Sequence, residues 1–360
     1  MVQSVQAALT ITSNGADMSD SLLAAVRTHD TVILDGSAGE FVLGHTVVLK
    51  HLQNKTIIGT HDACLRTRFC LTKAIRAMLD SADVMSFSTA GEGGVLSNGQ
   101  NVREQRELKT RQLFIDRFND PEESFRASGC IQLSHCRDII VRGLHLQGPG
   151  AIDVGGNDLL GMDHSTRIFI DSCVFMDGMD GNLDITSQSD SITVSHCYFG
   201  YSERSYDHMN SNLVGAADRV VADRGKLHVT YAYCTWGEGC RQRMPMVRFG
   251  TILLDHCRWE CTTEHPAVDA RRESTVTIIS PSFGPGIKIP YRFAPDAQCL
   301  VRSNHLSLLS HICGNFPKIL LLRRSHRPRQ KKCSKICVCA IFVVPLQSQR
   351  LITSPLVPTA

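Results

Sequence analysis

The stretch Thr166–Phe175, TRIFIDSCVF, alternates apolar and polar residues and ends in a cysteine followed two positions later by an aromatic residue. β-Branched and aromatic residues dominate it, as is typical of a half-buried strand. Similar segments recur along the chain. They are CRDIIVRGLHL from Cys136, TRIFIDSCVF from Thr166, DSITVSHCYF from Asp190, KLHVTYAYCTW from Lys226, TILLDHCRW from Thr251 and STVTIISPSF from Ser274.

The recurrence has the period of a solenoid built on strands. Alignment on Cys173, Cys197, Cys234 and Cys257 gives steps of 24, 37 and 23 residues, and the long step holds a polar, glycine-rich insertion around residues 211–225. Repeats of about 20–29 residues with short strands indicate a solenoid. No helical periodicity separates the repeats, which argues against a leucine-rich or βαβ arrangement. We therefore predict an all-β fold, a right-handed parallel β-helix, whose identical side chains stack at about 4.8 Å from coil to coil.

Two internal ladders follow from this stacking. The aligned cysteines form one ladder, and the aromatic residues two positions later form a parallel one. The chain contains 15 cysteines, and we expect those in the ladder to be free, buried thiols. Disulfides that join Cys173 to Cys197, or Cys234 to Cys257, are the alternative. The aromatic positions are Phe175, Phe199, Trp236, Trp259 and Phe283.

Residues 1–285 are predicted to form one β-helix domain. Its first strands lie in DTVILDG from Asp30, HTVVLK from His45 and NKTIIGT from Asn54. Helical spacing of apolar residues predicts a helical insertion at about residues 70–128. After about residue 286 the strand pattern ends, and we expect residues 286–360 to be a basic, cysteine-containing tail that is disordered or non-native.

Composition excludes several classes of protein. The net charge of +3 does not indicate a nucleic-acid binder, and the basic run at residues 323–332 is confined to the tail. No apolar run of about 18 residues predicts a transmembrane helix, and no signal peptide is visible at the N-terminus. We expect a monomer. The 15 histidines form no metal-ligand spacing such as H-E-x-x-H, and we interpret His164, His196 and His256 as structural or rim residues.

Aspartates cluster before and after the stretch that opened this section. Asp158 and Asp184 lie 26 residues apart, so they are expected on adjacent coils. Asp180 joins them only if the chain turns at Gly181, a residue suited to turns. Three converging carboxylates repel one another unless a cation lies among them. Oxygen ligands favour Ca²⁺ over Zn²⁺.

A basic motif follows on a later coil. Arg243 and Arg248 lie five residues apart around Pro245 in RMPMVRFG. By itself such a motif is a basic turn that precedes a strand. Downstream of an acidic cluster that holds a cation, it indicates an anionic substrate such as an acidic polysaccharide.

These motifs together resemble the pectate lyases of polysaccharide lyase family 1. The stretches NDLLGMDHSTRIFIDSCVF, DGNLDITSQSDSITVSHCYFG, QRMPMVRFG and HPAVDARRESTVTIISPSF carry the resemblance. It implies a calcium-dependent lyase that cleaves polygalacturonate by β-elimination and is secreted to reach its substrate. It also implies calcium binding by Asp158, Asp180 and Asp184.

The resemblance implies roles for three arginines. Arg243 matches the family's catalytic base and Arg248 its uronate-binding arginine, while Arg204 takes the place of a substrate-binding lysine. Arginine is an unusual base because its guanidinium is ordinarily protonated, so we expect an alkaline activity optimum. The alternatives are a pectin lyase that acts on methylated chains and a β-helix that binds polysaccharide without catalysis.

Overall fold

A computed structural model describes residues 8–73, 77, 108, 112, 127–153, 156–302 and 319–321. The chain divides into two compact units, residues 1–323 and 324–360. All described residues belong to the first unit. Most of the predicted helical insertion at 70–128 lies outside the described residues, as does most of the predicted tail.

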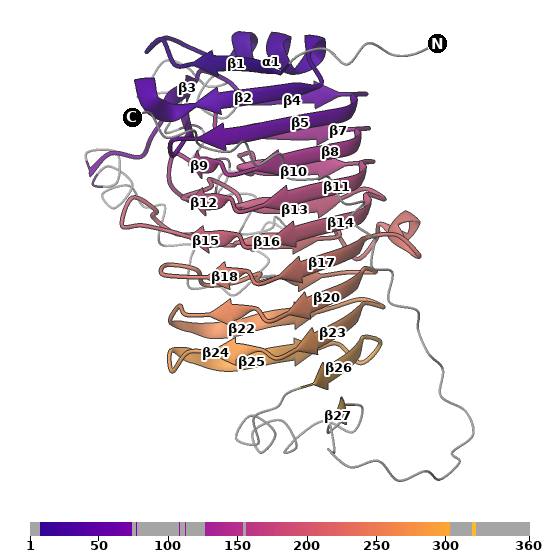
Figure 1. Cartoon of the computed structure of the whole chain (residues 1–360). Coiled ribbons are helices and arrows are strands. Elements are labelled where there is room, and N and C mark those ends of the chain that lie inside the picture. Colours follow the sequence, from indigo (N-terminus) through magenta and orange to yellow (C-terminus); the bar gives the residue numbers. More distant parts are fainter. Residues whose placement is uncertain are drawn as a thin grey trace, which may run out of the picture. The chain divides into compact units, whose positions relative to one another are not determined.

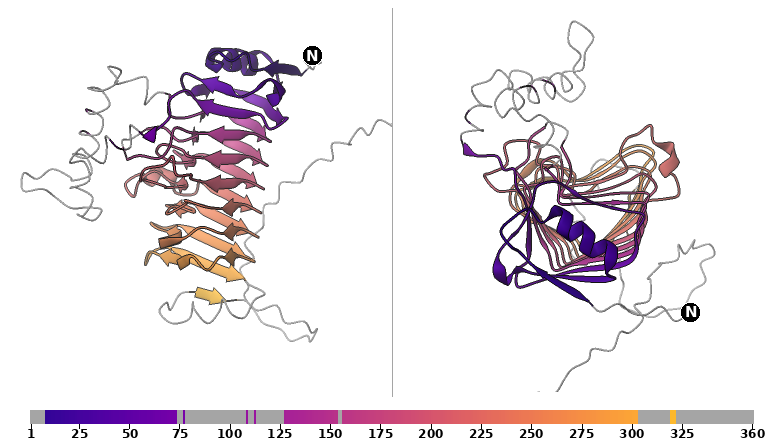
Figure 2. Two further views of the ribbon diagram at one scale, coloured as in Figure 1. Left: turned by 90° about the vertical axis from the view of Figure 1, so that its left-hand side faces the viewer. Right: turned by 90° about the horizontal axis from the view of Figure 1, so that it is seen from above.

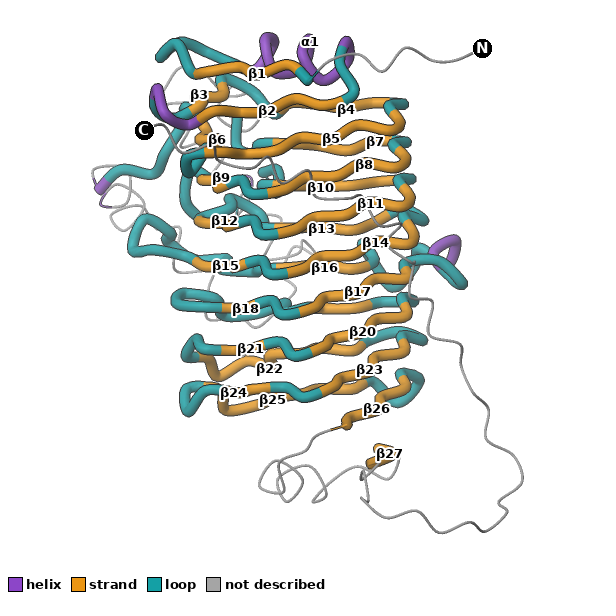
Figure 3. The backbone as a smooth tube through the Cα atoms, in the orientation of Figure 1, coloured by secondary structure: helices purple, strands orange, loops and turns teal. Residues whose placement is uncertain are grey.

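The described residues of the first unit form a right-handed parallel β-helix, which confirms the predicted fold (Figures 1 and 3). Each complete coil contributes one strand to each of three sheets, and every strand pairs in parallel with the equivalent strands of the coils before and after it. We name the three sheets the acid sheet, the long sheet and the aromatic sheet.

The acid sheet carries the predicted aspartates. Its strands are β4 (Val47–Lys50), β7 (Ile131–Ser134), β10 (Leu160–Asp163), β13 (Leu183–Thr186), β16 (Asn212–Val214), β19 (Met246–Val247), β22 (Thr263–Ala270) and β25 (Ile287–Phe293).

The long sheet follows the acid sheet in each coil. Its strands are β1 (Leu9–Thr12), β2 (Thr31–Asp35), β5 (Gln53–Thr60), β8 (Arg137–Arg142), β11 (Thr166–Asp171), β14 (Asp190–Ser195), β17 (His228–Ala232), β20 (Thr251–Asp255), β23 (Thr275–Ile279), β26 (Gln298–Arg302) and β27 (Ile319–Leu321).

The aromatic sheet completes each coil and holds the aromatic ladder. Its strands are β3 (Phe41–Leu43), β6 (Cys64–Thr67), β9 (His145–Gln147), β12 (Val174–Met176), β15 (Tyr198–Gly200), β18 (Thr235–Trp236), β21 (Arg258–Trp259) and β24 (Ser282–Phe283). Two 3₁₀ turns, η1 (Gly36–Ala38) and η3 (Val221–Asp223), lie in connections between strands.

Each segment that the sequence predicted as one strand is two strands in different sheets. The chain turns at a residue just before the cysteine, which adopts the left-handed conformation: φ is 53° at Ser172, 50° at His196 and 56° at Tyr233. A single left-handed residue breaks the pleat and redirects the chain. Alternation of apolar residues runs through both strands, so the sequence pattern did not reveal the corner.

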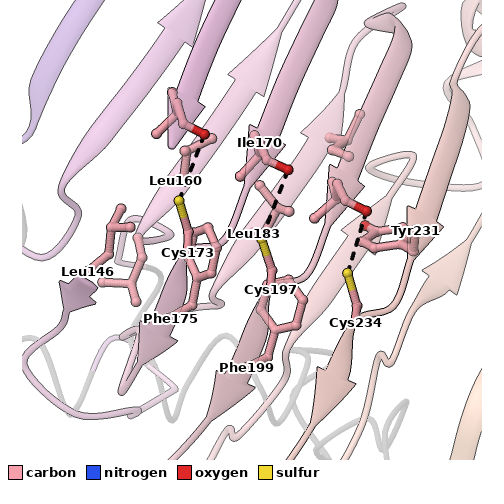
Figure 4. Packing of buried hydrophobic residues seen from close by; sticks show 14 of the residues in the cluster. Leu146, Leu160, Ile170, Cys173, Phe175, Leu183, Cys197, Phe199, Tyr231 and Cys234 are labelled. Atoms are coloured by element: carbon pink, nitrogen blue, oxygen red, sulfur yellow. Dashed lines mark hydrogen bonds between the residues drawn. The ribbon is translucent and has the colours of Figure 1, made fainter. Parts of the chain in front are cut away.

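The core contains both predicted ladders. Cys173, Cys197, Cys234 and Cys257 are free and buried, which confirms the prediction of unpaired thiols. Their Sγ atoms point to carbonyl oxygens of the neighbouring coil, as from Cys234 to Val194 O at 3.5 Å (Figure 4).

The aromatic rings stack without interruption over five coils. Centroid distances are 5.0 Å from Phe175 to Phe199, 5.7 Å from Phe199 to Trp236, 5.0 Å from Trp236 to Trp259 and 4.5 Å from Trp259 to Phe283. The predicted aromatic ladder is therefore confirmed.

We expect Trp236→Ala to lower the free energy of unfolding by about 3–5 kcal/mol, as for other fully buried aromatic residues. Trp236 is fully buried between two other rings, and its Nε1 donates to Asn212 Oδ1 at 2.5 Å. Urea denaturation measures the loss. Trp236→Phe keeps the stack and removes the hydrogen bond, so it should cost clearly less. Equal losses in the two variants would contradict a dominant role for the stack.

A helix that the sequence did not predict covers the N-terminal end of the coils. Helix α1 (Ser19–Thr28) buries Leu22 and Val26 and packs beside β2 and β4. Seen along the coil axis, it crosses the open end of the first coil (Figure 2). It shields apolar core residues that would otherwise face water at the end of a solenoid.

The strand pattern continues beyond the predicted end at residue 286. β25 pairs with β22, and β26 pairs with β23 in register from Thr275 and Gln298 onward. The prediction that nothing after this point continues the solenoid was wrong for residues 287–302. These strands lack the cysteine and the regular spacing of the earlier repeats, so the pattern was not recognised. No helix in the described part of the chain combines the length and hydropathy of a membrane span.

Candidate functional site

The predicted calcium acids lie at the start of two neighbouring strands of the acid sheet. In the register of β10 and β13, Gly161 is opposite Asp184. Asp158, two residues before β10, lies beside Gly181 on the next coil. The two acids are therefore on adjacent coils, as predicted, but they are diagonal to each other and not directly opposite.

Gly181 separates the two carboxylates. A Cβ atom at Gly181 would lie 2.6 Å from Asp158 Oδ1 and 3.3 Å from Asp184 Oδ1, so any side chain there would collide with the acids. The Leu213 amide donates to Asp184 Oδ1 at 3.1 Å, whereas the inaccessible Oδ1 of Asp158 has no hydrogen-bond partner among the described residues. The glycine thus leaves room at the point where the carboxylates converge.

Electrostatics make this an unfavourable place for bare negative charge. Burial raises the pKa of Asp158 well above its ordinary value, and the Asp184 and Asp180 carboxylates raise it further, while Arg243 opposes the shift. Burial raises the pKa of Asp184 to about 7; Arg243 lowers it and Asp180 raises it. A bound cation would reverse the repulsion that raises both values.

Asp180 has a partner that the sequence did not predict. His208 Nε2 lies 3.0 Å from Asp180 Oδ1, and His208 Nδ1 lies 3.4 Å from Asp153 Oδ1. The histidine side chain is only 8% exposed. Asp180 therefore faces His208, and the carboxylates of the three predicted ligands do not all come within 4.8 Å of one another among the described residues. His208 was overlooked because it lies in a loop with no repeat pattern.

Arg243 lies on the following coil, next to the acids. Its main chain is left-handed, with φ of 56°, and its carbonyl accepts from the Asn212 amide at 2.6 Å. The Met244–Pro245 peptide bond that follows is cis. The guanidinium attracts both Asp158 and Asp184, so the structure brings the predicted base and two of the predicted ligands together.

Arg248 is held by its own acid. Its Nε donates to Asp218 Oδ1 at 2.7 Å, its Nη1 donates to Gly215 O at 3.2 Å, and its side chain is 14% exposed. Burial lowers the pKa of Arg248, the Asp218 carboxylate opposes this, and Arg271 and Arg243 add to the lowering. Arg248 lies close enough to Arg243 for the two cations to repel.

Arg204 lies elsewhere. Its Nη1 donates to Gly148 O at 3.3 Å, on the loop after β9. The residue that pairs beside the Arg243 loop is Asn210, which bridges to Gln242. The predicted insertion around residues 211–225 explains the difference, because β16 lies inside it and splits the extra residues into one loop before the strand and one after it. Loop length therefore displaced the expected position.

The donor set fits a hard divalent cation. It consists of carboxylate oxygens, one of them buried and without a hydrogen-bond partner, and Ca²⁺ prefers such ligands. Mutual repulsion at Asp158 and Asp184 is the second feature that a cation would relieve.

Comparisons with known proteins identify similar sequences. Residues 94–257 match the family model described as pectate lyase, which confirms the resemblance over that range. The probable pectate lyase B of Aspergillus terreus is 32% identical over 154 residues, which are 41% of this chain and 44% of that protein. The pectate trisaccharide-lyase of Thermotoga maritima is 31% identical over 128 residues, 34% of this chain and 33% of that protein. The matched region spans less than half the length of each relative.

Two solved structures share the fold. A pectate lyase of Bacillus subtilis, in an arginine-to-lysine mutant, has a TM-score of 0.50 and 16% identity, covering 87% of this chain and 80% of that one. A thermostable pectate lyase has a TM-score of 0.51 and 15% identity, covering 91% and 88%. At such identities the likeness supports the parallel β-helix alone.

Proposed function

We propose that this chain, whose residues 94–257 match the pectate lyase family, is a calcium-dependent pectate lyase that cleaves polygalacturonate by β-elimination to unsaturated oligogalacturonides. The observation that carries the proposal is the position of Arg243 beside two buried carboxylates whose pKa values are raised by burial and repulsion. The site combines a cation-binding half and a guanidinium, which suits an anionic substrate. A pair of catalytic carboxylic acids, as in glycoside hydrolases, would repel that substrate.

Asp158, Asp184 and Asp180 are the proposed calcium ligands. Asp158 and Asp184 supply oxygens beside Gly181, and Asp180 joins them by turning away from His208. When bound, calcium supplies positive charge that neutralises a uronate carboxylate and stabilises the negative charge that develops on it.

Arg243 is the proposed base. In its neutral form the guanidine takes the proton from C5 of the sugar, next to the carboxylate. The electron pair of the broken C–H bond becomes the C4–C5 double bond, and the C4–O bond breaks so that the leaving oxygen takes a proton from water. Arg243 then returns its proton to solvent. Since neutral guanidine becomes more abundant as pH rises, the rate should be highest on the alkaline side.

Arg248 and Arg204 are proposed to bind uronate carboxylates on either side of the reacting sugar. Arg248 does so by exchanging the Asp218 carboxylate, to which it is now paired, for that of the substrate. Because the substrate is a plant-type wall polymer outside cells, we propose that the protein is secreted and acts as a monomer.

Ultraviolet absorbance of the unsaturated product tests the proposal on polygalacturonate and on methylated pectin, each with calcium and with chelator. We expect product from polygalacturonate only with calcium, and a rate that rises above neutral pH. Activity on methylated pectin despite chelator would support a pectin lyase instead. Absence of product from both polymers, with retained binding to polygalacturonate, would support a non-catalytic polysaccharide-binding protein.

A further inference from the structure

Three histidines form a ladder at the corner where the acid sheet ends. His51, His135 and His164 each follow the last residue of β4, β7 and β10, and these last residues, Lys50, Ser134 and Asp163, are paired in register. All three histidines are left-handed, with φ of 56°, 53° and 45°. Their equivalent positions therefore stack from coil to coil.

The rings lie face to face. The centroids of His135 and His164 are 4.6 Å apart with planes inclined by 12°, and those of His51 and His135 are 5.0 Å apart. The side chains of His135 and His164 are 46% and 43% exposed, so the imidazole nitrogens are open to water.

Asp163 holds the two outer-coil histidines together. Its Oδ1 lies 3.6 Å from His135 Nδ1 and 3.1 Å from His164 Nδ1. Ser134 Oγ donates to the same oxygen at 2.9 Å, and Gln132 Nε2 donates to Oδ2 at 3.0 Å. The carboxylate is thus fixed by neutral donors on the coil before it, with the two imidazoles beside it.

We propose that His135, Asp163 and His164 form a binding site for a divalent transition-metal ion, for which zinc is the best match. One ligand atom of each residue lies within 4.8 Å of the others, the only such group among the described residues. Two imidazole nitrogens and a carboxylate oxygen suit zinc, with water in the fourth position. Calcium prefers oxygen ligands alone.

The site is separate from the proposed active site. Asp163 ends β10, whereas Asp158 precedes its first residue. Five residues along a strand correspond to about 16 Å. The ion would join two successive coils at this corner, since His135 lies on one coil and Asp163 and His164 on the next.

Isothermal titration of the full chain with ZnSO₄ tests the proposal. We expect one ion bound, with an affinity that falls about ten-fold or more in His164→Asn and again in His135→Asn, because losing a ligand should cost no less than losing a residue that orients one. Asparagine is chosen because it tolerates the left-handed backbone. Thermal unfolding without metal checks that each variant folds.

His256→Asn is the matched control. His256 is also left-handed and exposed, and its Nδ1 lies 2.7 Å from Asp255 at the end of a strand. Its stacked neighbour is Tyr233, so it lacks a second imidazole. Unchanged zinc affinity in His164→Asn, or an equal loss in His256→Asn, would overturn the proposal.

A parallel titration with Co²⁺ separates imidazole from thiolate ligands. We expect visible absorption without a thiolate charge-transfer band, and its loss in the His135→Asn/His164→Asn double variant. A thiolate band that survives in that variant would show that cysteines bind the metal, and would also overturn the proposal. Neither titration depends on lyase activity.

Discussion

Arg243→Ala should lower kcat on polygalacturonate by about 10²–10⁴-fold, the usual contribution of a general base. Arg243 is the arginine that attracts both Asp158 and Asp184, and alanine supplies neither a base nor a positive charge there. The rate of product formation at saturating substrate and calcium measures the loss.

A separate measurement shows whether the variant still folds. The carbonyl of Arg243 accepts from Asn212 through the main chain, and the substitution keeps that bond. We therefore expect calcium-loaded Arg243→Ala to unfold at nearly the same temperature as the parent protein. Arg243→Lys keeps the charge but not the planar fork, so it should recover calcium affinity more than turnover.

Arg241→Ala provides the matched control. Arg241 is exposed in the same loop, two residues before Arg243, and none of the pKa shifts at the acids is attributed to it. Its loss should leave kcat within about two-fold, as for a surface substitution. Near-normal turnover of Arg243→Ala, or an equal loss in Arg241→Ala, would refute the role of Arg243 as base.

The sequence predicted those parts of the fold that repeat. A cysteine and an aromatic residue at a fixed offset determine which side chains face the core, and their period determines which positions stack. The corner at Ser172 was not predictable because apolar alternation continues through it. Helix α1 was missed for a similar reason, since it occurs once and belongs to no repeat.

The candidate site was predicted in part. Asp158 and Asp184 could be paired because about one coil separates them, and Arg243 because it follows on a later coil. His208 and Asn210 could not, since they lie in a loop of irregular length, and the same loop moved Arg204 to Gly148. The ladder of His135 and His164 was hidden because a separation of 29 residues is a metal-ligand spacing only once the coil length is known.

Asp184→Asn should have opposite effects on stability without and with calcium. Burial raises the pKa of Asp184 to about 7 in the folded state, against an ordinary 3.8. The folded protein therefore binds more protons than the unfolded chain between these values. The contribution of Asp184 is fully present below about pH 4 and is lost as pH rises through about 7.

Without calcium, the asparagine variant should be the more stable protein above neutral pH. Asparagine carries no charge to bury, its side-chain oxygen still accepts from the Leu213 amide, and its NH₂ group faces Asp158 across Gly181. The free energy of unfolding in chelator, followed from pH 4 to 9, should fall less steeply in the variant than in the parent. Asp255→Asn, at an exposed corner beside His256, should leave the slope unchanged.

With calcium, the order should reverse. Calcium at about 100 times its Kd adds about 2.7 kcal/mol to the stability of a protein that binds it only when folded, and the parent should gain this amount. Asp184→Asn removes one ligand and one negative charge, so it should gain little and should lose activity at the same calcium concentration. A variant that gains as much from calcium as the parent would exclude Asp184 as a ligand. A variant less stable than the parent in chelator at pH 9 would show that ionised Asp184 is not a cost to the fold.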